Sequence, residues 1–132
     1  MKYLLDTHTL LWALENNPNL PENIKDIIDD ERNTIYVSVV SLWEIAIKNK
    51  INKLPYDSKQ ITNICTKSGY IFQYLGCQSV NSYSDLRIKD GVIPNKDPFD
   101  QMLVAQSKVL GIPFLTHDEK MKYFDEPTIV LY

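Results

Sequence analysis

Segments typical of buried strands alternate with segments typical of helices along the whole of this 132-residue chain. The strand-like segments are short and rich in β-branched and aromatic residues, as 34–38 (TIYVS) shows. The helix-like segments repeat apolar residues every three or four positions, as Leu42, Ile45 and Ala46 do. Such alternation usually produces neighbouring parallel strands with helices on both faces of the sheet. We therefore predict an α/β fold with a mainly parallel sheet of about five strands.

The alternation continues without a repeat, a linker or a low-complexity tract, so we predict one domain over residues 1–132. Pro18 interrupts the first helix, and Asp97 followed by Pro98 is a favoured helix start. The predicted strands cover 2–6, 34–38, 70–75, 112–115 and 128–131. The predicted helices cover 7–15, a stretch that begins at Pro21, then 41–53, 58–68, 79–88, 97–111 and 116–124, with a loop at 91–96.

The composition excludes several classes of protein. No apolar run reaches the roughly 18 residues of a membrane span. The N-terminus reaches Asp6 after too short an apolar run for a signal peptide, so we expect a cytoplasmic protein with no membrane contact. The two cysteines form no C-x-x-C pair and lie far in sequence from both histidines, so a zinc site has no support.

Acidic residues stand just after the predicted strands or in the first turns of the helices that follow. Asp6 ends the first strand, Glu44 lies one turn into the helix after the second, and Asp118 follows the fourth. Asp97 and Asp100 lie one turn apart at the start of the helix after the loop. Because the carboxyl ends of parallel strands meet at one edge of a sheet, we expect these side chains to gather there.

A cluster of carboxylates needs a cation or shared protons. Two carboxylates about 5 Å apart repel by roughly 3 kcal/mol at an effective dielectric constant of about 20. Oxygen ligands alone favour Mg²⁺ or Mn²⁺ over zinc, and such an ion activates water beside a phosphate. The net charge of −3 would become +1 without four such acids, so it does not exclude an anionic substrate.

Each acid also has a purely structural explanation. Asp6, Asp97 and Asp118 suit the N-cap position of a helix. Glu44 is spaced to pair with Lys48 on the same helix face. Taken singly, each acid is explained as well by structure as by function; their shared edge in the predicted sheet favours function.

Four motifs in order resemble those of PIN-domain proteins, most of all the VapC-like toxins of bacterial toxin–antitoxin pairs. The resemblance extends from Tyr3 to near the end of the chain. The motifs are Leu4–His8 (LLDTH), Ser41–Ile45 (SLWEI), Lys96–Asp100 (KDPFD) leading to Leu103–Gln106 (LVAQ), and Leu115–Asp118 (LTHD).

The resemblance implies an α/β/α sandwich and hydrolysis of RNA phosphodiester bonds by a water activated by Mg²⁺ or Mn²⁺. It also implies two further catalytic residues: Thr116, which matches the hydroxyl residue near the last acid of the family, and Asp97, which matches an additional acid of this branch. The spacing before Ala105 favours Asp100 over Asp97 as the closer ligand. The implied metal ligands are Asp6, Glu44, Asp100 and Asp118.

Two positions depart from the pattern. Asn95 stands where similar sequences often have His, and Gln101 stands where Arg is usual. Neither position is a metal ligand in the pattern, so the departures leave the predicted activity in place. The missing Arg affects how the RNA backbone, or the loop that bears Asp97, is held.

The toxin branch implies an RNA substrate, a cognate antitoxin protein and a homodimer. An Arg or Lys of the antitoxin would enter the acidic site, because a guanidinium matches carboxylate geometry. An amphipathic segment would occupy a groove beside it. We expect that groove among Leu11, Trp12, Ile24, Ile27 and Ile28, unless these side chains are core.

Other residues near the motifs have two interpretations each. Trp12 and Trp43 either stack RNA bases or belong to the core or a partner interface. His8 is either a general base or a packing residue. Lys48, Lys50 and Lys53 form either a solvated helix face or a basic run that points away from the nearby acids and contacts phosphates.

Two other functions remain as alternatives. An aspartyl-nucleophile phosphatase also has an Asp at the end of its first strand, but it needs a second acid where this chain has His8. A nuclease fold that has lost activity and serves as a binding module is the other; the complete set of acids argues against it.

Overall fold

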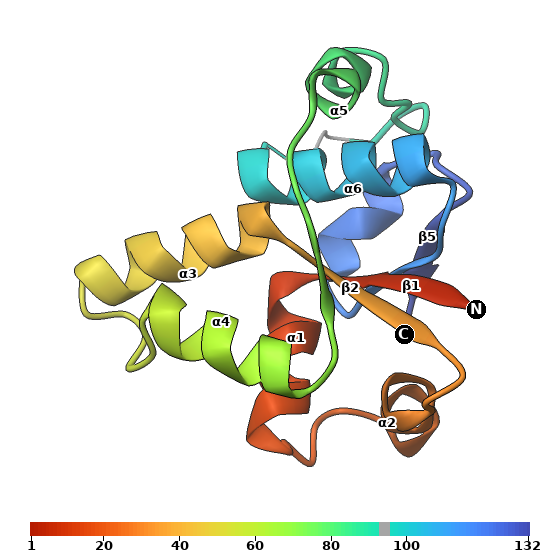
Figure 1. Ribbon diagram of the computed structural model, residues 1–132. Helices are drawn as coiled ribbons and strands as arrows, with labels where there is room; N and C mark the ends of the chain where they lie inside the picture. Colours follow the sequence, from red (N-terminus) through yellow and green to blue (C-terminus); the bar gives the residue numbers. More distant parts are fainter. Residues whose placement is uncertain (93–95) are drawn as a thin grey trace.

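A parallel sheet lies at the centre of the molecule (Figure 1). Within residues 1–92 and 96–132, which this computed structural model describes, the sheet has five strands in the order β3-β2-β1-β4-β5. All neighbouring strands are parallel, which confirms the predicted fold class. The strands are β1 (Lys2–Leu5), β2 (Thr34–Ser38), β3 (Ile71–Gln73), β4 (Phe114–Thr116) and β5 (Ile129–Leu131).

Helices cover both faces of the sheet. In Figure 1, α6 lies on one side of the strands, and α1, α2 and α4 lie on the other. The helices are α1 (Thr7–Glu15), α2 (Glu22–Asp29), α3 (Val39–Lys50), α4 (Ser58–Lys67), α5 (Cys77–Tyr83), α6 (Pro98–Leu110) and the 3₁₀ helix η1 (Glu119–Tyr123).

Consecutive residues of β1 face opposite cores, as the two-residue period of a strand requires. Leu5 packs with residues of α1, α2 and α4, whereas Leu4 packs with Leu103 and Val104 of α6 and with Met121 of η1. Both leucines are almost fully buried. The molecule is therefore the α/β/α sandwich that the resemblance implied.

Most predicted boundaries agree with the structure to within a few residues, and the exceptions have local causes. Helix α3 begins at Val39 rather than Ser41, because the Ser38 hydroxyl caps it by accepting from the Val40 N–H. Strand β4 begins at Phe114 rather than Ile112, because the Ile112 N–H donates to Ser107 at the end of α6.

Two further predicted helices are shorter in the structure. The stretch 79–88 forms a helix only as far as Tyr83, and 116–124 forms a short 3₁₀ helix. The predicted loop at 91–96 lies partly outside the described residues, and so does Asn95. Among the described helices, none combines the length and the apolar character needed to cross a membrane.

Candidate active site

The carboxyl ends of β1 and β4 place two acids side by side. Leu5 pairs with Leu115, and the Asp6 N–H donates to the Leu115 carbonyl at 3.1 Å. Asp6 therefore lies level with Thr116, whose hydroxyl donates to Asp6 Oδ2 at 2.5 Å. The same hydroxyl oxygen accepts from the Asp118 N–H at 3.2 Å, so Thr116 joins Asp6 to the segment that bears Asp118.

Asp6 is a buried carboxylate directly after β1. Only 4% of the residue is exposed, and it forms no ion pair with any described residue. Its Oδ1 caps α1 by accepting from the Thr9 N–H at 2.6 Å, which confirms the structural explanation for this acid. Capping does not account for the burial, because caps work well at the surface and a buried anion needs compensation.

A threonine hydroxyl links Glu44 to the residue that follows Asp6. The Thr7 hydroxyl, next to Asp6 in the chain, lies 2.7 Å from Glu44 Oε1 and 3.0 Å from Ser41 Oγ. The Lys48 ammonium lies 2.9 Å from Glu44 Oε2, so the predicted pairing within α3 is confirmed. Lys48 therefore does not point away from the acids, because a spacing of four residues places it over Glu44.

The start of α6 approaches α3 through an aromatic contact. The rings of Trp43 and Phe99 lie 5.1 Å apart in an edge-to-face arrangement. Since Trp43 precedes Glu44 and Phe99 precedes Asp100, this contact brings the first turn of α6 toward the turn of α3 that bears Glu44. Asp97 caps α6, and its Oδ1 accepts from the Phe99 and Asp100 N–H groups.

A buried hydrogen bond fixes α6 against the sheet. The Ser38 hydroxyl, at the end of β2, donates to the Gln106 side-chain oxygen, and both residues are almost fully buried. We missed the roles of Thr7, Ser38, Ser41 and Gln106 in the sequence, although three of them stand inside the quoted motifs. A hydroxyl directly after an acid, as in Asp6-Thr7, was the available signal.

Asp118 is half-buried and caps η1. Its Oδ1 accepts from the Lys120 N–H at 2.9 Å, which confirms the predicted cap. His117 precedes Asp118 in the chain, and Tyr132 follows β5, the strand next to β4. His8 is exposed, and its ring makes an edge contact with Trp12, with centroids 6.5 Å apart.

Threonine hydroxyls link Asp6 to the segment of Asp118 and to Glu44, but these acids do not form a finished metal site. Among residues 1–92 and 96–132, no three His, Cys, Asp or Glu side chains lie close enough to hold an ion as they stand. The donors are nonetheless all carboxylate or hydroxyl oxygens, which suits a hard divalent cation. The buried Asp6 carboxylate, with no positive partner among the described residues, also fits a cation at this edge.

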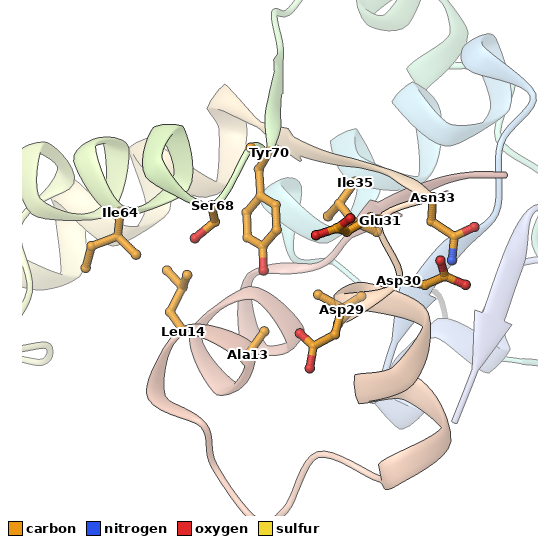
Figure 2. Close-up of a pocket in the computed structure, with 12 residues that line it drawn as sticks. Ala13, Leu14, Asp29, Asp30, Glu31, Asn33, Ile35, Ile64, Ser68 and Tyr70 are labelled. Carbon is orange, nitrogen blue, oxygen red and sulfur yellow. The ribbon is translucent and has the colours of Figure 1, made fainter.

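A cavity lies between α1, α2 and α4 and is not lined by any of the predicted site acids (Figure 2). Its volume is about 530 Å³; Ala13, Leu14 and Ile28 are among its apolar lining. Tyr70 points into this cavity, and three acids lie at its margin: Asp29, Asp30 and Glu31.

The proposed partner groove is only partly available in the structure. Leu11, Ile24 and Ile28 are buried in the core, as the structural alternative held. Trp12 and Ile27 are half-buried and pack against that core. The surface offered to a partner is therefore narrower than the sequence suggested.

Comparison with known proteins finds solved structures of similar fold and a matching family. The chain is similar to a chain of VapBC2 from Rickettsia felis bound to a DNA fragment from their promoter, with 20% identity, a TM-score of 0.69 and coverage of 100% of this chain and 98% of that one. It is similarly close to a chain of DNA-bound VapBC from Salmonella typhimurium, with 17% identity, a TM-score of 0.69 and coverage of 98% and 97%. No curated protein sequence matches significantly. The sequence profile of the PIN domain matches residues 3–127, nearly the whole chain, and the protein therefore belongs to the PIN-domain family.

Proposed function

We propose that this protein is a divalent-metal-dependent endoribonuclease and the toxin of a toxin–antitoxin pair. PIN domains are nucleases that generally use divalent metal ions. The observation that carries the proposal is Asp6, buried at a strand end with no positive partner among the described residues and joined through Thr116 to Asp118.

The ion would be held by Asp6, Glu44, Asp100 and Asp118. When bound, it would supply a Lewis acid and a more acidic water next to the phosphodiester. Thr116 orients the Asp6 carboxylate, and Thr7 orients Glu44. Asp97 fixes the first turn of α6, so its role in catalysis is to position Asp100.

An RNA cleavage assay with and without a chelator tests the nuclease. We expect single-stranded RNA to be cut with Mg²⁺ or Mn²⁺ and to stay intact with EDTA, leaving 5′-phosphate ends. The matched control is Asp26→Asn, which removes an exposed carboxylate of α2 and should cut normally. RNA cleavage that continues in EDTA would contradict the dependence on a metal ion. Hydrolysis of a small phosphomonoester, without RNA cleavage, would indicate the aspartyl-nucleophile phosphatase. The absence of both reactions would indicate a binding module that has lost activity.

The toxin role rests on the fold shared with chains of two VapBC assemblies and on the cavity of Figure 2. Its apolar lining and acidic margin suit a basic, amphipathic segment of an antitoxin. Arg32 lowers the pKa of Asp30 to about 2 through its hydrogen bonds and pairs with the same carboxylate at 2.8 Å, so Asp29 and Glu31 are the acids of the margin that Arg32 does not pair with. A homodimer, as is usual in the family, completes the proposal.

Co-expression tests the partner. The protein should inhibit growth when expressed alone and be tolerated when its cognate antitoxin is co-expressed, and the two should co-purify. Harmless expression of a chain that cuts RNA in vitro would exclude the toxin role while leaving the nuclease in place.

A further inference from the structure

Four aromatic side chains form a continuous row at the flank of the acids. Trp12 of α1 lies 5.2 Å from His117, and His117 lies 5.1 Å from Tyr132, measured between ring centroids. His8 makes an edge contact with Trp12. We call these residues the aromatic row; they come from α1 and from the segments that follow β4 and β5.

The row borders a cavity that opens beside Asp118. The cavity is lined by His8, Trp12, His117 and Asp118 and has a volume of about 350 Å³. That volume is in the range of pockets for small organic groups, roughly 300–1,000 Å³. Both histidines are exposed, so the cavity is open to a ligand from solvent.

Hydrogen bonds hold the row in place. His117 Nδ1 lies 2.5 Å from the Tyr132 carbonyl oxygen, which can only accept, so Nδ1 carries the proton. The Tyr132 hydroxyl lies 2.6 Å from Thr9 Oγ1. Burial, with a smaller contribution from nearby Asp6, raises the pKa of Tyr132 to about 12, so this hydroxyl stays neutral.

The lining favours a flat, uncharged group with polar edges. Trp12 is tilted by 52° against His117 and by 76° against His8, so these rings do not stack face to face on one another. Among the residues that the structure describes, no lysine or arginine lines the cavity, which argues against a phosphate there. Aromatic faces of this kind bind unpaired bases of single-stranded RNA in many proteins.

We propose that this cavity is a stacking subsite for one unpaired base of the RNA, next to the phosphodiester at the acids. The proposal rests on the proposed ribonuclease function. It predicts that RNA binds here only where this base is unpaired. Asp118 belongs to both places, since it lines the cavity and is joined through Thr116 to Asp6. An arginine of a partner peptide is the competing occupant.

Trp12 fluorescence reports on the subsite without cleavage. The chain has two tryptophans, so Trp43→Phe leaves Trp12 as the single fluorophore, with folding checked by circular dichroism. In EDTA, a single-stranded RNA oligonucleotide should quench Trp12, and the same sequence as a duplex should not. Equal quenching by the duplex, no quenching, or quenching only by an arginine-containing peptide overturns the proposal.

Variants at His117 isolate the contribution of the ring, because Trp12 also packs on the core and its truncation endangers the fold. His117→Ala should weaken single-strand binding and raise KM roughly tenfold with little change in kcat. His117→Phe should restore both, although it also lacks the hydrogen bond to Tyr132. If His117→Ala cleaves RNA with an unchanged KM, the stacking subsite is contradicted and the nuclease function is not. If the wild-type protein does not cleave RNA but single-stranded RNA still quenches Trp12, only the nuclease function is contradicted.

Discussion

Single hydroxyl groups decide how the acids of this site are presented. The Thr116 hydroxyl donates to the Asp6 carboxylate, and the Thr7 hydroxyl donates to the Glu44 carboxylate. Such hydrogen bonds to a charged acceptor are stronger than those between neutral groups. The acids are therefore fixed in direction before any ion arrives, which lowers the cost of ordering them on binding.

Asp6→Asn should abolish RNA cleavage, with activity lower by more than about 100-fold, because even loss of a group that supports a ligand costs 10–100-fold. The asparagine oxygen can still cap α1 by accepting from the Thr9 N–H. Thermal stability without metal should be unchanged or higher, since one buried charge is gone. Normal cleavage by the purified variant at ordinary Mg²⁺ concentrations would remove Asp6 from the site.

Thr7→Val should lower stability by about 1–3 kcal/mol, because it leaves the buried Ser41 and Glu44 without their shared partner. Cleavage should fall as well, since Glu44 loses its orientation. Thr7→Ser keeps the hydroxyl and is the matched control, with a near-normal denaturant midpoint. If valine and serine behave alike, the hydroxyl is not what holds Glu44.

At the scale of elements, the sequence predicted best where local chemistry decides the boundary. Asp97, Pro98 and Gly111 mark both ends of α6, and the structure has a cap at each. The acids were expected at one sheet edge from their positions after strands, and threonine hydroxyls link Asp6, Glu44 and Asp118 there. The approach of Asp100 to them and the binding of a metal stay predictions. Ring contacts such as His117 with Tyr132 were not predicted, because they depend on β4 and β5 being neighbours.

A buried carboxylate ties the elements at the far end of α6 together. The Glu126 side chain is 1% exposed and accepts from the Arg87 N–H, while Lys108 of α6 pairs with it at 3.0 Å. Burial opposes its ionisation, but the hydrogen bonds from Arg87 and Lys108 outweigh burial and lower its pKa.

Glu126→Gln should therefore lower the free energy of unfolding by about 1–3 kcal/mol near neutral pH. Because the folded-state pKa lies below the ordinary value of 4.5, this contribution is complete above that pH. It is lost as the pH falls through the folded-state pKa. Urea unfolding across this range checks the sign: the two proteins should converge in acid, and a gap that widens in acid contradicts it.

At the scale of the whole molecule, the fold brings together acids that are far apart in the sequence and belong to different elements. Several carboxylates are partly satisfied by the protein itself: Glu44 by Lys48, and Asp97 and Asp118 by helix N–H groups. A divalent ion at this edge would compensate the buried Asp6 carboxylate and would have to draw other acids closer, because no three acids of the described residues lie close enough to hold an ion as they stand.

Mg²⁺ or Mn²⁺ should therefore raise the melting temperature of the metal-free protein. An ion that binds only the folded state adds about 2.7 kcal/mol at a concentration 100 times its Kd, which corresponds to a shift of several degrees for a domain of this size. Asp6→Asn should show little of this shift, because it removes the buried charge that the ion would neutralise, whereas Asp26→Asn should keep it. Differential scanning calorimetry at millimolar metal decides the matter. The same melting temperature with and without metal in the wild type would mean that the acids of this edge do not share an ion.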